Sequence, residues 1–179
     1  VQHYHQKAAY CGLCFYDADA FPAEYRGRLF MGNIHGGCLN SDSVARKGAS
    51  YFATPNPDLL TSNDAWFMPV SQKVGPDGAL WVLDWYDRYH CYQDARRDPP
   101  GIDRGKGRLY RITYGDARVA RPPEAGRLPD DRLVELLGSP NVLLRRQARQ
   151  ALIERSVAGA ALEKLALEGD RKSTRLNSS

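Results

Sequence analysis

One short unit of turn and strand occurs twice in the sequence, and this repeat constrains the fold more than any other feature. Leu29–Asn33 follows a turn that contains Gly27, and Leu80–Asp84 follows the turn at residues 75–78, so that equivalent positions lie 51 residues apart (33 to 84). A period of roughly 40–50 residues is typical of one β-propeller blade. Gly78 falls where the second turn requires a positive φ, which predicts a tight reversal between neighbouring strands.

Residues 9–114 carry the signals of short strands separated by turns. Runs of aromatic and β-branched residues are bounded by Gly, Pro, Asn and Asp. Two blades cannot close a propeller, which needs roughly four to eight of them. We therefore expect residues 1–117 to be mainly β, forming about two C-terminal blades of a partial β-propeller, and half of a β-sandwich is the alternative. The predicted strands are residues 10–16, 28–34, 51–54, 70–74, 79–85 and 107–113.

The apolar period changes from two to about 3.6 after Gly115, which predicts helices. We expect residues 118–127 to be a linker and residues 128–169 to begin an all-α, HEAT-like helical repeat, with its second helix at residues 142–155. Short helices with narrow apolar faces must stack on further repeats. The shared faces carry Leu133, Leu136 and Leu137 in the first helix, Leu144, Ala148, Ala151 and Leu152 in the second, and Ala158, Ala161, Leu162 and Leu165 in the third.

The ends and the charge of the chain bound its other properties. Residues 170–179 lack apolar periodicity and are similar to the translated sequencing adapter that ends some metagenomic reading frames, with a polar tail as the alternative. The chain opens at Val1 without an initiator Met, so we expect a fragment of a longer protein.

The net charge of +4 forms no basic stripe among aromatic residues, which argues against binding of nucleic acid. No run reaches the roughly 18 consecutive apolar residues of a membrane span.

Short motifs spread over residues 9–114 carry a family resemblance. They are AYCGL at 9–13, FPAEYRG at 21–27, NIHG at 33–36, NDAWF at 63–67, GPDGAL at 75–80, DWYD at 84–87 and GRLYRI at 107–112. Together they resemble the glucose/sorbosone dehydrogenase-like β-propeller of the planctomycete-type membrane-bound dehydrogenases. In that family HEAT-like repeats follow the propeller, and a haem c domain with a Cys-x-x-Cys-His motif often comes next. This chain contains no such motif.

The resemblance implies an exported protein, periplasmic or secreted, that oxidises a sugar or an alcohol. It further implies pyrroloquinoline quinone and calcium as cofactors and electron transfer to a cytochrome c domain of the full-length protein, so the fragment alone is not expected to be active. Relatives often carry Arg after the Trp-Phe pair, where this chain has Met68, so the cofactor-binding residues stay unknown. The alternative function is a non-catalytic propeller and HEAT scaffold that binds a polysaccharide or a protein partner.

Four polar residues are candidates for the site. Asn33 and Asp84 end equivalent strands, where loops of neighbouring units can converge on a ligand. Asp84 and Asp87 are candidate oxygen ligands for Ca²⁺, and the alternative for Asp84 is to accept backbone N–H groups at the strand end. His35 is the candidate catalytic base toward a hydroxyl group, and a loop residue bonded to a carbonyl is the alternative.

The cysteines and aromatic residues allow several interpretations. The repeat offset places Cys38 near Cys91, which makes them a candidate disulfide. Zinc binding through His35, Cys38, His90 and Cys91 is the weaker alternative. We interpret the large aromatic residues as packing between blades, with stacking on a sugar as the alternative for two of them, Trp85 and Tyr86. The aromatic set is Trp66, Phe67, Trp81, Trp85, Tyr86 and Tyr110.

Overall fold

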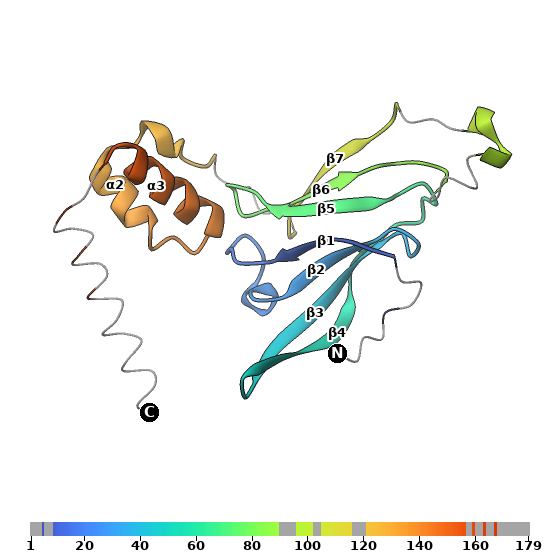
Figure 1. The fold of residues 1–179 in the computed structure, drawn as a ribbon, viewed down its shortest axis with the longest axis horizontal. Helices are drawn as coiled ribbons and strands as arrows, with labels where there is room; N and C mark the ends of the chain where they lie inside the picture. The colour runs from blue at the N-terminus through green and yellow to red at the C-terminus, as the bar shows by residue number, and fades with distance from the viewer. Residues whose placement is uncertain are drawn as a thin grey trace. The chain divides into compact units, whose positions relative to one another are not determined.

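The structure is a computed structural model of the 179-residue chain. It describes residues 5, 9–89, 96–101, 105–115, 121–156, 159, 163 and 167. The chain divides into two compact units, Val1–Ala120 and Arg121–Ser179. Within the described residues, the first unit contains seven β-strands and the second contains two α-helices (Figure 1).

The seven strands form two antiparallel sheets. Four consecutive strands make the first sheet and three consecutive strands make the second, so chain neighbours are also sheet neighbours. Such a meander is built from successive hairpins. The first sheet contains β1 (Tyr10–Phe15), β2 (Leu29–Asn33), β3 (Cys38–Lys47) and β4 (Ser50–Thr61), and the second contains β5 (Pro69–Val74), β6 (Leu80–Asp84) and β7 (Arg108–Ile112). The short 3-10 helices η1 (Ala23–Tyr25) and η2 (Pro99–Gly101) lie between strands.

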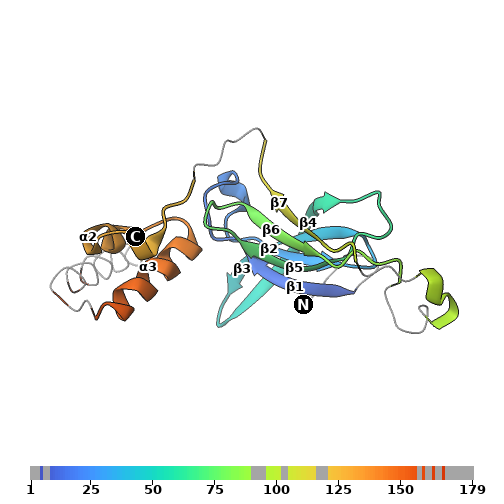
Figure 2. The same ribbon diagram turned by 90° about the horizontal axis from the view of Figure 1, so that it is seen from above.

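The hairpin of β3 and β4 is the longest element of the first sheet. β3 has ten residues and β4 has twelve, and their pairing runs from Cys38 opposite Thr61 to Lys47 opposite Ser50. Figures 1 and 2 show the tip of this hairpin reaching beyond the other strands. β4 is an edge strand and contains Pro55, whose missing N–H an edge strand tolerates.

The two sheets pack against each other where β5 lies against β1 and β2. Pairing places Phe30 and Gly32 opposite Ser41 and Leu39, so all four share the face that meets the second sheet. The second sheet contributes a matching apolar face. Its fully buried or nearly buried side chains are Val74, Leu80 and Val82.

Gly32 permits the close approach of β2 and β5. A Cβ atom added at Gly32 would lie 1.9 Å from the carbonyl oxygen of Pro69 and 2.6 Å from Nε2 of Gln72. Both distances are far below a van der Waals contact, so no larger residue fits while the strands keep their spacing. Gln72 itself is buried at this interface.

Tyr16 connects the first sheet to the turn between β5 and β6. Its hydroxyl donates to the carbonyl oxygen of Gly78 at 2.9 Å and accepts from the backbone N–H of Phe21 at 2.9 Å. The ring is fully buried and stacks on Phe21 with 4.7 Å between ring centroids. Burial raises the pKa of Tyr16 to about 12, so the hydroxyl keeps its proton and remains a donor.

The turn between β5 and β6 confirms the tight reversal predicted from the sequence. Gly78 has a φ of 76°, and its N–H donates to the carbonyl oxygen of Gly75 at 3.0 Å. Asp77 accepts from the N–H of Ala79 at 3.1 Å through Oδ1, and from Nε of Arg111 at 2.5 Å through Oδ2. The carboxylate therefore fixes the turn and ties it to β7.

The second unit is a helix pair with a small core. It contains η3 (Ala125–Arg127), α2 (Asp130–Leu136) and α3 (Val142–Glu154). Asn141 caps α3 by accepting the N–H of Leu143 at 2.8 Å. The buried residues of this core are Ala125, Leu133, Ala148, Ala151 and Leu152. Both helices confirm the 3.6-residue apolar period, while the four apolar residues assigned to a third helix and residues 170–179 lie outside the described residues.

The predicted fold class, a partial β-propeller followed by a HEAT-like helical repeat, is wrong. The described residues contain two packed antiparallel sheets in place of blades, and one pair of short helices in place of a repeat. A helical repeat needs further pairs to stack on, and the described part of the chain has only α2 and α3. The 51-residue offset instead relates β2 and β6, which are the second strands of two meanders, and hairpins of this kind occur in many β folds.

Within the same described ranges, no helix has the length and apolar character needed to cross a membrane.

Candidate functional site

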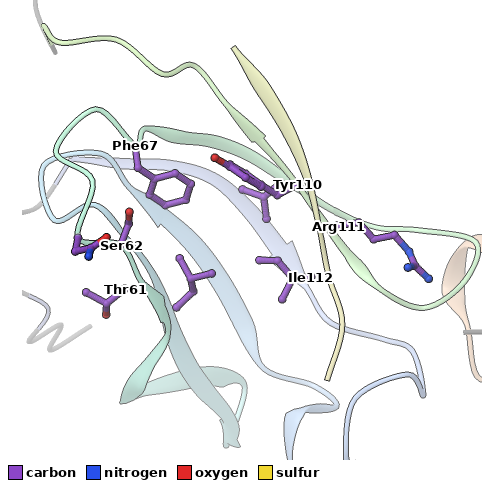
Figure 3. Close-up of a pocket in the computed structure, with 9 residues that line it drawn as sticks. Thr61, Ser62, Phe67, Tyr110, Arg111 and Ile112 are labelled. Atoms are coloured by element: carbon purple, nitrogen blue, oxygen red, sulfur yellow. The ribbon is translucent and has the colours of Figure 1, made fainter. Parts of the chain in front are cut away.

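A pocket opens between the C-terminal end of β4 and the inner face of β6 and β7, within the first unit (Figure 3). We call it the aromatic pocket. Its volume is about 640 Å³, which is in the range of sites for small molecules. Its lining residues are Leu60, Thr61, Ser62, Asn63, Phe67, Val82, Tyr110, Arg111 and Ile112.

Two aromatic rings form one wall of the aromatic pocket. Phe67 and Tyr110 meet edge to face, with ring centroids 5.9 Å apart and an interplanar angle of 62°. Tyr110 and Ile112 are two residues apart on β7, so strand alternation places both side chains on the same face. Figure 3 shows Ser62 and Thr61 on the other side of the cavity from Ile112 and Tyr110. The pocket therefore has an apolar, aromatic wall and a wall of hydroxyl groups.

No charged group among the described lining residues points into the aromatic pocket. Arg111 is the one ionisable member besides the Tyr110 phenol, and Figure 3 shows its side chain turned away from the cavity. Its Nε donates to Oδ2 of Asp77 at 2.5 Å, so the charge of the Arg111 guanidinium is neutralised outside the pocket. Burial raises the pKa of Asp77, but the hydrogen bonds from Arg111, Trp81 and Ala79 outweigh it and hold the pKa below its usual value. The pocket therefore suits an uncharged ligand.

A second pocket lies next to the first, and we call it the loop pocket. It has a volume of about 340 Å³ and lies between the turn after β2 and the loop after β4. Ser62 and Asn63 line both pockets, so the two cavities share a wall. The lining residues are Ile34, His35, Gly36, Gly37, Ser62, Asn63, Asp64 and Ala65.

Hydrogen bonds hold the shared wall in place. The N–H of Ser62 donates to the carbonyl oxygen of Gly37 at 2.9 Å, which joins the loop after β4 to the turn after β2. Oγ of Ser62 accepts from the N–H of Asp64 at 3.0 Å, and Oδ1 of Asp64 accepts from the N–H of Trp66 at 3.0 Å. These bonds are the local turns that short polar side chains favour. The loop is thus preorganised, with the Ser62 hydroxyl proton still free to be offered to a ligand.

A family model described as "Domain of unknown function (DUF7133)" matches residues 1–116. The chain belongs to this family. The DUF7133 match covers both sheets and both pockets, and comparisons with curated proteins and with solved structures give no match. Because DUF7133 has no assigned function, it does not confirm the resemblance to the planctomycete-type dehydrogenases. The described residues of this DUF7133 domain give no evidence for a propeller, which is corrected above, and none for a dehydrogenase, whose activity stays a prediction.

Three of the predicted site residues have structural contacts in the DUF7133 domain. Asn33 is fully buried, donates to Oδ1 of Asn40 at 3.0 Å and accepts from the N–H of Gly36 at 3.0 Å. Asp84 is 1% exposed, and its Oδ1 accepts the N–H groups of Met68 at 2.8 Å and Tyr86 at 2.9 Å. This is the strand-end alternative given for Asp84.

Asp87 resembles Asp84 in its surroundings. It is 3% exposed, and its Oδ1 accepts the N–H of Tyr89 at 3.2 Å. Neither aspartate lines the aromatic pocket or the loop pocket, and the same is true of Asn33. Among the described residues, no cluster of three or more His, Cys, Asp or Glu is arranged to hold a metal ion. Calcium binding by Asp84 and Asp87 therefore stays a prediction.

Among the described residues, His35 is the one predicted site residue that lines either of these two pockets. It is exposed and lines the loop pocket, opposite Asp64 and Ala65 of the neighbouring loop. Its predicted role as a catalytic base stays a prediction. The structure brings His35 together with residues that the sequence did not single out as functional.

Cys38 is a buried free thiol in the structure, and its predicted partner Cys91 lies outside the described residues. The disulfide therefore stays a prediction. Burial, the negative charge of Asp58 and a hydrogen bond with Asp58 raise the pKa of Cys38 to about 11. At neutral pH the thiol therefore keeps its proton in the absence of a metal, and zinc binding stays a prediction. His90, the other member of the proposed zinc set, also lies outside the described residues.

The sequence interpretation missed most of the aromatic pocket. Phe67 and Tyr110 were expected to pack between blades, but they line a cavity. The alternation in β7 could have placed Tyr110 on a face with Ile112, and the NDAWF motif at residues 63–67 contains both Asn63 and Phe67, but neither signal indicated a cavity. The predicted sugar-stacking residues Trp85 and Tyr86 line neither pocket. Arg108 covers the ring of Tyr86, with its guanidinium carbon 3.5 Å from the ring centroid.

Proposed function

We propose that the DUF7133 domain is a non-catalytic binding module whose aromatic pocket takes a neutral, polyhydroxylated ligand, namely a saccharide. The observation that carries the proposal is the pairing of an aromatic wall with a hydroxyl and amide wall around an uncharged cavity. Phe67 and Tyr110 supply the first wall, and Thr61, Ser62 and Asn63 supply the second.

The chemistry of a saccharide matches both walls. A pyranose ring has a face of C–H groups, which carry a small positive charge and are attracted to the negative face of an aromatic ring. Its rim carries hydroxyl groups, which need donors and acceptors when they leave water. A side-chain amide and two hydroxyl groups provide both, and their fixed positions discriminate between ligands that differ in one hydroxyl.

The same lining set favours binding over catalysis. No carboxylate, imidazole, thiol or amine is among the described residues whose side chains point into the aromatic pocket. General acid–base chemistry most often uses one of these groups within hydrogen-bonding distance of the substrate. The Tyr110 phenol is the one remaining acid or base among those described side chains, and the proposal assigns its ring to stacking on the ligand. The proposal does not depend on what the family resemblance implies. The quinone-dependent oxidation, the cytochrome partner and the exported location stay predictions.

Calorimetric titration of the full chain with maltose, cellobiose, xylobiose and mannobiose tests the proposal. We expect one of these neutral disaccharides to bind, and Tyr110→Ala to weaken binding by at least about tenfold, because loss of a stacking ring costs roughly 0.5–1.5 kcal/mol beyond the area it buries. Tyr51→Ala is the matched control, since Tyr51 is an exposed strand tyrosine of β4 outside both pockets. Absence of binding by all four sugars, or equal loss in both variants, contradicts the proposal.

A further inference from the structure

We infer that the aromatic pocket and the loop pocket are consecutive subsites of one groove, so that the ligand is an oligosaccharide chain longer than the aromatic pocket alone holds. This inference rests on the proposed function of the aromatic pocket. Its first support is geometric, because Ser62 and Asn63 line both cavities.

The shared residues can serve a ligand on both sides. Asn63 is exposed and carries two donors and an acceptor on its amide, so it can bond to sugar units in either cavity. The Ser62 hydroxyl accepts from the N–H of Asp64, and its own proton can still be donated to a ligand. An oligosaccharide that lies across this loop would thus keep its hydroxyl groups hydrogen-bonded along its length.

The two cavities differ in their lining residues, as expected for successive subsites that bind different units of one polymer. The aromatic pocket holds a ring face, while the described lining of the loop pocket includes no aromatic residue and offers His35 and Asp64 as polar groups. The loop pocket is also the smaller, at about 340 Å³ against about 640 Å³. We therefore assign the main stacking site to the aromatic pocket and an extension site for a further sugar unit to the loop pocket.

The geometry of the loop pocket makes the groove rigid before the ligand arrives. The N–H of Ser62 donates to the carbonyl oxygen of Gly37 at 2.9 Å and so connects the two walls of the loop pocket. The N–H of Gly36 donates to Oδ1 of Asn33 at 3.0 Å. A preorganised wall loses little conformational entropy on binding, so each added contact contributes to affinity. Chain length should therefore raise affinity until both cavities are filled.

The test compares short and long sugars on the full chain and on variants. Titrations use maltose, cellobiose and xylobiose, and then maltohexaose, cellohexaose and xylohexaose. We expect the hexasaccharide of the preferred series to bind at least about tenfold more tightly than its disaccharide, the gain from one or two additional net hydrogen bonds. Ala65→Trp, which fills the loop pocket, should bring the ratio of hexasaccharide to disaccharide affinity close to one.

Ala49→Trp is the matched control, because Ala49 is an exposed alanine at the tip of the β3–β4 hairpin. It should leave both affinities unchanged. Equal affinity for short and long sugars, with no effect of Ala65→Trp, overturns the inference while the saccharide site itself stands. Absence of binding by every sugar overturns the proposed function and the inference with it.

Discussion

Replacement of Gly32 by alanine should lower the free energy of unfolding of the first unit, Val1–Ala120, which we call the β unit. The loss should be larger than that caused by alanine at any other glycine with a similar backbone conformation. The Cβ would lie 1.9 Å from the Pro69 carbonyl oxygen, about 1.5 Å inside the 3.4 Å at which ordinary contacts begin. Both partners are backbone in packed strands, so β2 and β5 must separate. Overpacking of a core costs roughly 1–3 kcal/mol, and this contact belongs at the upper end, about 3 kcal/mol.

The assay is urea unfolding of the full chain followed by tryptophan fluorescence, since the three tryptophans at positions 66, 81 and 85 all belong to the β unit. A loss of about 3 kcal/mol is a large share of the roughly 5–15 kcal/mol that stabilises a typical domain. Gly107→Ala is the matched control, because its Cβ would meet only ordinary contacts at 3.5 and 3.7 Å. If Gly32→Ala and Gly107→Ala unfold at the same urea concentration, the packing of β2 on β5 is incorrect.

Three further changes test other contacts. Tyr16→Phe leaves a buried carbonyl and a buried N–H without their partner and should cost about 1–3 kcal/mol in the same urea assay, whereas an unchanged midpoint would exclude these two bonds. Asp77→Asn should destabilise by about 1.5 kcal/mol at pH 7. Because the folded-state pKa of Asp77 lies below the unfolded value of about 4, this difference should persist above pH 4 and vanish as pH falls through the folded pKa; a difference independent of pH contradicts the ion pair. Asn141→Ala should cost about 1 kcal/mol of helix stability, measured by circular dichroism at 222 nm, and an unchanged melt would exclude the cap.

Local sequence signals predicted the individual elements well. The turn at Gly78 follows from the turn-forming residue types at 75–78. The apolar periods predict β2, β6, α2 and α3 to within a few residues of their observed bounds. These are local properties, set by φ preferences and by which face of an element is apolar. β3 was missed because its sequence CLNSDSVARK is largely polar, and β4 was predicted too short because prolines interrupt it.

The arrangement of the elements could not be predicted in the same way. The close contact of Gly32 with Pro69 joins residues 37 positions apart, and no periodicity encodes it. The repeat of β2 in β6 was assigned to blades, although it specifies only two similar hairpins. For the candidate site, His35 was found because histidine is a conspicuous residue type. Ser62 and Asn63 were not, because they are ordinary loop residues that become neighbours of Tyr110 only through sheet packing.

The most direct test of the saccharide site is to map amide chemical shifts of the ¹⁵N-labelled full chain while maltohexaose, cellohexaose and xylohexaose are added in turn. The account predicts that at least one sugar shifts the amides of residues 60–63 and 110–112, with further shifts at residues 34–37 when both pockets are filled. Shifts confined to the tip of the β3–β4 hairpin or to α2 and α3, or no shifts with any of the three sugars, would contradict it.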